Sequence, residues 1–268
     1  MTLAPPALAI PDAARARVMA DLARIERDEG VRILFAVESG SRAWGFPSPD
    51  SDYDARFVYA RQPDWYLSLE PGRDVIELPI DGDFDVNGWD IRKALLLIMK
   101  PNPVLIEWLQ SPIRYAWDEA LCSQLRDFAS RTAYTRACLH HYLGLAERLW
   151  GEFVDGRSEV NLKKYLYILR PSLCLQWIRE SRGMPPMSLP ELMAGLDLPE
   201  SFREEVTSLL EKKAKSSEVG IGPRQAALDE YIGREMAWGR SSPVELHTDP
   251  SVRAEAEELF RSIVKGGV

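Results

Sequence analysis

The residues of this 268-residue chain best suited to chemistry lie in one short stretch, ESGSRAWGFPSPDSDYDARFVYA, which runs from Glu38 to Ala60. Within it, Asp52 and Asp54 are two positions apart. Side chains two apart on a strand point to the same face, so these two carboxylates are expected to lie side by side. Adjacent anions repel each other unless a cation lies between them, and Mg²⁺ is commonly held by carboxylates together with substrate phosphates.

A Gly–Ser pair, Gly40 and Ser41, precedes the two aspartates. Such a turn after a strand can offer backbone N–H groups and a hydroxyl to phosphate oxygens. We predict a phosphate-contacting turn here, and Arg42 could either contact phosphate or anchor the loop. A phosphate-binding turn beside paired carboxylates suits metal-assisted nucleotidyl transfer. The predicted cofactor is therefore Mg²⁺, with Mn²⁺ as the other candidate, and the predicted substrate is a nucleoside triphosphate (NTP).

Metal-assisted transfer of this kind usually needs a third carboxylate on a neighbouring strand. Asp85 is the candidate, because it lies in mid-strand and faces away from the apolar Phe84 and Val86. Asp90 is the competitor, although it fits better as the N-cap of the helix that follows. The predicted catalytic and metal-binding residues are thus Asp52, Asp54 and Asp85, with Asp90 left open as the alternative third carboxylate.

The hydrophobic pattern supplies strands and helices that could hold these residues. Residues 31–38 form a continuous apolar run typical of a buried strand, and residues 53–60 alternate as a half-buried strand does. Two further strands are separated by a tight turn at DGD, and residues 111–116 could form an edge strand. These two strands are expected over residues 74–80 and 84–89. Helices are expected over residues 11–30, 90–100 and 102–110.

Helical periods dominate from about Trp117 onward, over residues 118–131, 133–150, 160–181, 201–215 and 252–264. The sequence therefore predicts an α+β catalytic domain over residues 1–116 and an all-helical nucleotide- or substrate-binding domain over residues 117–268. In the latter, Lys163, Tyr167 and Arg170 are spaced to share one helix face. Lys and Arg there could oppose a triphosphate, or the face could simply be solvated. A solvated helix end is the favoured interpretation of EKKAK at 211–215.

Composition limits the class of protein. Hydrophobic residues make up 46% of the chain, which is enough for a real core. The net charge of −8 argues against binding of nucleic acid by bulk basic charge, although a local basic groove remains compatible with it. Three widely spaced cysteines, an N-terminus without signal-peptide features and the lack of any apolar run near the ~20 residues of a membrane span favour a cytoplasmic protein.

The GS-x(n)-DxD pattern resembles the motif of the DNA polymerase β-like nucleotidyltransferase superfamily. Longer strings are similar to its RNA-repair-associated RlaP/YcgL branch, over roughly residues 31–235: ESGSRAWGFPSPDSDYDARFVY, GWDIRKAL, NPVLIEWLQSP and NLKKYLYILRP. The resemblance implies a polymerase β-like palm, a mixed sheet with helices, followed by a helical domain. It also implies metal binding by Asp52, Asp54 and Asp85, and phosphate contact at Gly40 and Ser41.

The resemblance further implies transfer of a nucleoside monophosphate to an acceptor hydroxyl, with an RNA 3′ end favoured by the family context. Two alternatives stay open. One is nucleotidylation of a protein or a small molecule, such as adenylylation. The other is an antitoxin-like partner protein that binds NTP without turnover. The sequence indicates neither the base of the NTP nor the oligomeric state.

Overall fold

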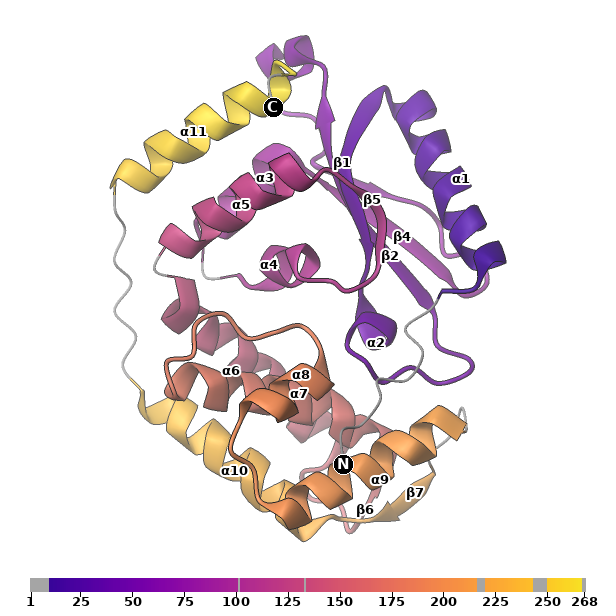
Figure 1. Ribbon diagram of the computed structural model, residues 1–268, viewed down its shortest axis with the longest axis vertical. Helices are drawn as coiled ribbons and strands as arrows, with labels where there is room; N and C mark the ends of the chain where they lie inside the picture. The colour runs from indigo at the N-terminus through magenta and orange to yellow at the C-terminus, as the bar shows by residue number, and fades with distance from the viewer. Residues whose placement is uncertain (1–9, 101, 133, 216–219, 243–249, 267–268) are drawn as a thin grey trace. The chain divides into compact units, whose positions relative to one another are not determined.

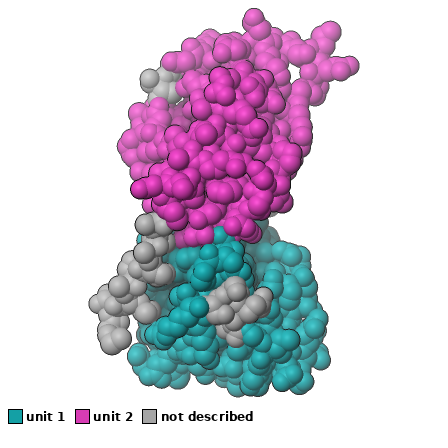
Figure 2. Space-filling view, turned by 90° about the vertical axis from the view of Figure 1, so that its right-hand side faces the viewer, with its two compact units in different colours: residues 1–6, 44–51, 135–246 teal, residues 7–43, 52–134, 247–268 magenta. Residues whose placement is uncertain are grey.

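The structure, a computed structural model, describes residues 10–100, 102–132, 134–215, 220–242 and 250–266. The chain divides into two compact units, which Figure 2 shows in different colours. Unit 1 contains residues 1–6, 44–51 and 135–246, and unit 2 contains residues 7–43, 52–134 and 247–268. The middle of the Gly–Ser and aspartate stretch, residues 44–51, therefore belongs to unit 1, whereas the residues on both sides of it belong to unit 2.

Unit 2 is built on a mixed five-stranded sheet in the order β3-β4-β2-β1-β5 (Figure 1). Strands β2 and β4 are parallel, and every other neighbouring pair is antiparallel. The strands are β1 (Val31–Glu38), β2 (Tyr53–Arg61), β3 (Val75–Glu77), β4 (Phe84–Asp90) and β5 (Arg114–Trp117). The predicted α+β class is confirmed, and the predicted edge strand is β5.

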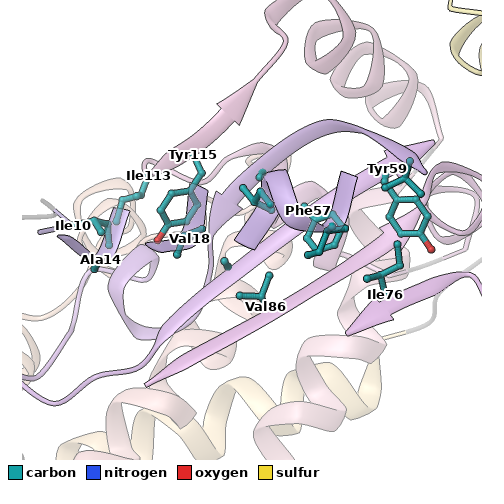
Figure 3. Close-up of a cluster of buried hydrophobic side chains, with 14 residues drawn as sticks. Ile10, Ala14, Val18, Phe57, Tyr59, Ile76, Val86, Ile113 and Tyr115 are labelled. Carbon is teal, nitrogen blue, oxygen red and sulfur yellow. The ribbon is translucent and has the colours of Figure 1, made fainter. Parts of the chain in front are cut away.

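Helix α1 (Asp12–Glu29) covers one face of this sheet, and it ends at Gly30 in the left-handed conformation, with φ of 61°. Val18 and Ile25 of α1 pack with Phe57 and Tyr59 of β2 in one buried cluster, part of which Figure 3 shows. The predicted alternation of β2 accounts for this arrangement, because its odd-numbered apolar side chains point toward α1. Its even-numbered side chains, which include Asp54, point to the opposite face.

Helices α3 (Ile91–Ile98), α5 (Glu119–Arg131) and α11 (Pro250–Val264) lie on the side of the sheet away from α1 (Figure 1). Helix α3 begins directly after β4 and, as predicted, is capped by Asp90, whose side chain accepts a hydrogen bond from the Arg92 backbone N–H. The remaining helices described in unit 2 are α2 (Gly40–Ala43), the 3₁₀ helix η1 (Pro63–Leu67) and α4 (Val104–Leu109).

Unit 1 is mainly helical, but it is not all-helical as predicted. A two-stranded antiparallel ribbon, β6 (Glu159–Asn161) and β7 (Ile221–Pro223), interrupts the helices. Three-residue strands carry too little alternation for their pattern to be visible in a sequence. The helices are α6 (Tyr134–Phe153), α7 (Leu162–Arg179), α8 (Leu189–Gly195), α9 (Glu200–Lys215) and α10 (Ala226–Ser241), of which α8 and α10 lie outside the helices predicted from sequence.

The two compact units do not divide at the boundary predicted between residues 116 and 117. Helices α5 and α11 lie in unit 2, although their sequences follow that boundary. Arg32 of β1 donates a hydrogen bond of 2.7 Å to the carbonyl of Ile263 in α11, which attaches this C-terminal helix to the sheet unit. A change from mixed to helical periods marks where helices begin, but it does not indicate which core they join. None of the helices in the described part of the chain combines the length and apolar character that crossing a membrane requires.

Candidate active site

Asp54 and Asp85 occupy directly paired positions in the sheet. They are partners in the parallel register of β2 and β4, one residue after the start of each strand. Paired residues on neighbouring strands point to the same face, so the two carboxylates lie side by side. The structure thus brings together two of the three residues predicted to bind metal, from strands whose pairing no local motif specifies.

A guanidinium lies between these two carboxylates. Arg56 Nη2 is 3.1 Å from Asp54 Oδ1 and 2.6 Å from Asp85 Oδ2, and Arg56 Nη1 donates to the Asp85 backbone carbonyl at 2.8 Å. All three side chains are only partly exposed. Burial raises the pKa of Asp54; Arg56 opposes this, and the charges of Asp85 and Asp52 add to it. The guanidinium of Arg56 therefore favours the ionised form of Asp54 and offsets part of the effect of its burial.

Glu38 is a buried carboxylate directly behind the pair, and sequence reasoning assigned it no role. It is fully buried at the end of β1, where it accepts hydrogen bonds from the Asp54 backbone N–H at 2.9 Å and from the Tyr115 hydroxyl at 2.5 Å. Burial raises the pKa of Glu38 to about 7, while both hydrogen bonds lower it. A glutamate that ends an otherwise apolar strand was the available signal, because an unpaired charge is rarely buried there.

The Gly–Ser turn packs against Asp54. Gly40 has φ of 59°, and a Cβ at this position would lie 1.9 Å from Asp54 Oδ2. The Ser39 backbone N–H also donates to the Asp54 carbonyl at 2.8 Å. Ser41 is buried, with 6% of its surface exposed. Any other residue at position 40 would therefore be strained in its backbone conformation and would force the Asp54 carboxylate to move.

Arg42 and Asp52 meet beside this turn. Arg42 Nε donates to the Asp52 backbone carbonyl at 3.1 Å, and its guanidinium lies 4.1 Å from the centre of the Tyr53 ring. These contacts support the anchoring role for Arg42 that the sequence left open beside phosphate contact. The Asp52 side chain is exposed at the edge of the site.

Asp90 lies elsewhere. It pairs with Tyr59, five positions along the strands from Asp54 and Asp85, and its fully buried carboxylate accepts hydrogen bonds from the Tyr66 hydroxyl and the Arg92 N–H. Asp90 therefore caps α3 at a distance from Asp54, and Asp85 is the carboxylate that lies beside Asp54.

The donor set fits a hard divalent cation in its chemistry, since Asp52, Asp54 and Asp85 offer only carboxylate oxygens. The raised pKa of Asp54 is a further sign that added positive charge would be favourable at the pair. In the described residues, however, no three acidic, histidine or cysteine side chains converge as a preformed metal site. Arg56 lies where such a cation would need access to Asp54 and Asp85, so cation binding requires its displacement or a site alongside it.

In unit 1, one residue of the predicted phosphate-facing stripe is buried and the other two are half-buried. Arg170 is 3% exposed, donates to the Met187 carbonyl at 2.8 Å and lies 4.9 Å from the Trp44 ring centre. The Tyr167 ring packs edge-on against Phe46, with 5.4 Å between ring centres. Burial of Arg170 corrects its placement on an accessible helix face, whereas Lys163 is half-buried at the start of α7. Periodicity placed these residues on one face correctly, but that face packs against residues 44–51.

Lys213 differs most from expectation. It belongs to EKKAK, which was predicted to form a solvated helix end, yet it is fully buried. Its Nζ donates to the Phe46 carbonyl at 2.5 Å and lies 4.5 Å from the Phe46 ring centre and 5.1 Å from that of Tyr167. Burial, followed by the charge of Lys163, lowers the pKa of Lys213 to about 7. This lysine anchors residues 44–51, the segment between the Gly–Ser turn and Asp52, within unit 1.

A model of the RNA repair pathway DNA polymerase beta family (RlaP) matches residues 14–262, which extends past the resembling strings in both directions. The chain is also 43% identical over 220 residues to the uncharacterized protein YcgL of Bacillus subtilis (strain 168), and this match covers 82% of the chain and 84% of that relative.

Proposed function

Because the chain belongs to the RNA repair pathway DNA polymerase beta family, we propose that it is a Mg²⁺-dependent nucleotidyltransferase. It transfers a nucleoside monophosphate from an NTP to the 3′ hydroxyl of an RNA. The observation that carries this proposal is the register of β2 and β4, which sets Asp54 beside Asp85 and next to the Gly40 turn. A carboxylate pair beside a turn that offers backbone N–H groups suits metal-assisted phosphoryl transfer.

Each group has a proposed role. Asp52, Asp54 and Asp85 would hold the divalent ion, which when bound supplies charge neutralisation at the transferring phosphoryl group. The Gly40–Ser41 turn orients the phosphates through backbone N–H groups, and Asp85 takes up the proton of the acceptor hydroxyl. The acceptor oxygen forms a bond to the α-phosphorus, the bond from that phosphorus to the bridging oxygen breaks, and pyrophosphate leaves. Most of the rate enhancement comes from positioning and charge stabilisation.

Two further features support the proposal without deciding the substrate. The printed description of the family connects it with RNA repair, which favours RNA as the acceptor. Lys163 is the partly exposed cation of the predicted stripe, and we assign it a phosphate-binding role within unit 1. Within unit 1, Arg170 contacts Trp44 and Tyr167 contacts Phe46, and these contacts hold residues 44–51 in place.

Labelled-nucleotide transfer tests the proposal. The purified protein is incubated with each α-³²P-labelled NTP, with MgCl₂ or MnCl₂, and with total RNA, and label is then sought in RNA and in protein. We expect metal-dependent labelling of RNA 3′ ends. Asp54→Asn and Asp85→Asn should abolish it, because each removes one carboxylate of the pair.

Asp90→Asn is the matched control, since it changes a carboxylate on the same strand outside the pair. This variant should transfer at the wild-type rate once the folded fraction is accounted for. Unchanged labelling in Asp54→Asn or Asp85→Asn would refute the site. Tight NTP binding with no transfer under any condition would instead favour a binding protein, and label in protein alone would favour protein nucleotidylation.

A further inference from the structure

A groove on unit 2, away from the carboxylate pair, carries three arginines in a row. Its volume is about 510 Å³, and α1 and the β3–β4 hairpin line it. Arg17, Arg24 and Arg27, the groove arginines, lie at i, i+7 and i+10 along α1, which places them along one helix face. At a rise of about 1.5 Å per residue, this row is about 15 Å long.

Buried acid holds part of this row in place. Asp21 is 6% exposed and accepts from Arg17 Nε at 2.9 Å and from Arg24 Nη2 at 3.0 Å. Arg17 also contacts the exposed Asp81 at 2.6 Å. An exposed ion pair such as Arg17–Asp81 contributes only about 0–1 kcal/mol to stability, so stability alone is a weak reason for that contact. Three arginines against two aspartates leave the lining net positive in a chain whose net charge is −8.

A row of stacked groups leads from this groove to the candidate active site. The Arg17 guanidinium lies 5.4 Å from the centre of the Phe84 ring, and Phe84 stacks on Tyr53 with 4.9 Å between ring centres and 18° between ring planes. Arg42 lies 4.1 Å from the Tyr53 ring centre on its own side and contacts the Asp52 carbonyl. Both rings are only partly buried. Phe84 and Tyr53 are also the residues directly before Asp85 and Asp54.

A row of guanidinium groups along an open groove, next to a stacked pair of aromatic rings, matches the chemistry that binds single-stranded nucleic acid. Phosphates pair with guanidinium groups, and bases stack on aromatic rings and guanidinium planes without regard to sequence. We propose that this groove binds the single-stranded RNA acceptor. The RNA lies along α1, with phosphates at the groove arginines and bases stacked on guanidinium planes, and its 3′ end reaches Asp54 and Asp85 around the start of strands β2 and β4. This assignment of the acceptor to RNA rests on the proposed function.

Fluorescence anisotropy tests the groove without requiring catalysis. A short 5′-fluorescein-labelled single-stranded RNA of mixed sequence is titrated with protein over a series of KCl concentrations, with neither NTP nor divalent metal present. The triple variant R17Q/R24Q/R27Q should bind more weakly than wild type. Loss of three phosphate contacts should lower the slope of log K against log[KCl] by about 2. Phe84→Leu should weaken binding by about two- to fivefold, because it removes the ring that lies against the Arg17 guanidinium and keeps an aliphatic core contact.

The matched control is R148Q/R253Q/R261Q, which removes the same charge from three exposed arginines elsewhere, each paired with a glutamate one turn away. It should retain wild-type affinity and nearly the wild-type salt slope. Equal losses in the two triple variants would overturn the groove in favour of bulk charge. Wild-type affinity in R17Q/R24Q/R27Q, or no RNA binding by the wild-type protein, would also overturn it. If the triple variant does not fold, as judged by circular dichroism, Arg24→Gln and Arg27→Gln are tested singly.

The binding and transfer assays fail separately. RNA that binds through the groove while no nucleotide is transferred would refute the proposed function and leave the groove standing. Transfer to RNA that is equally efficient in wild type and R17Q/R24Q/R27Q would refute the groove and leave the function standing.

Discussion

Asp54 and Asp85 lie directly opposite each other on parallel strands, and one guanidinium, that of Arg56, binds both carboxylates. The arrangement explains how a closely spaced pair of anions persists in a partly buried site. It also means that the protein carries an internal cation where the proposed reaction places a divalent ion. Arg56 therefore connects folding stability and metal binding, and the two can be measured together.

Arg56→Met should destabilise the metal-free protein by about 1–3 kcal/mol, because it leaves two carboxylates without their shared partner. Added MgCl₂ should then raise the melting temperature of the variant more than that of wild type, since the ion no longer competes with the guanidinium. Thermal unfolding with and without MgCl₂ measures both effects. Arg56→Lys keeps the charge, so its stability and its response to MgCl₂ should lie between those of wild type and Arg56→Met. Equal stabilisation of wild type and Arg56→Met by MgCl₂ would contradict this connection.

Gly40→Ala should abolish nucleotidyl transfer and destabilise the protein. The left-handed backbone costs a residue with a Cβ about 1–2 kcal/mol, and the new Cβ would in addition meet Asp54 Oδ2 at 1.9 Å. Gly82→Ala is the matched control, because Gly82 has φ of 60° with open space around it. Thermal unfolding should show the larger loss for Gly40→Ala, and transfer should be lost only there. Equal losses of stability would show that Gly40 is needed for its conformation alone.

Local pattern predicted the elements around the site. Alternation from Tyr53 to Tyr59 predicts the strand and its two faces. The apolar neighbours of Asp85 predict that its side chain points away from the core, as a third carboxylate would. What pattern could not provide is the register between β2 and β4, which forms between segments far apart in the chain. The pairing of Asp54 with Asp85, and the bridging by Arg56, follow from that register.

Long-range packing also decided where sequence reasoning failed. Arg170 and Lys213 lie in stretches that look like solvated basic helix, and each is buried because residues 44–51 pack onto α7 and α9 within unit 1. A lysine on a helix carries no local sign of the carbonyl it will meet. Glu38 could have been found in the sequence, because it ends a mostly apolar strand. A charged residue buried there needs a hydrogen-bond partner.

Lys213→Met should change how stability depends on pH. The pKa of Lys213 is lowered from 10.5 to about 7 by burial and then by Lys163, while Asp50 opposes the shift and Lys164 adds to it. A lowered amine pKa gives stability that is fully present above pH 10.5 and is lost as pH falls to about 7. The free energy of unfolding of wild type, relative to that of Lys213→Met, should therefore decrease as the pH is lowered from 10.5 to about 7. The slope should approach about 1.4 kcal/mol per pH unit.

Urea unfolding at a series of pH values measures that difference, and Lys212→Met is the control because Lys212 is exposed on the same helix. Lys212→Met should follow the wild-type curve. A constant difference between wild type and Lys213→Met across the window would show that Lys213 titrates alike in the folded and unfolded chain, contrary to its burial.

Glu38→Ala should lower both stability and transfer, although Glu38 is not expected to touch substrate. The substitution leaves the Asp54 N–H and the Tyr115 hydroxyl without their buried acceptor, which costs about 1–3 kcal/mol. Without that hydrogen bond, Asp54 is also no longer fixed relative to Asp85. Glu38→Gln keeps a carbonyl oxygen for the Asp54 N–H and should retain most of the activity, while Tyr115→Phe removes a single partner and should cost less than Glu38→Ala. Unfolding and labelled-nucleotide transfer on the three variants decide the matter: a Glu38→Ala protein that transfers at the wild-type rate would show that Asp54 is held by its strand alone.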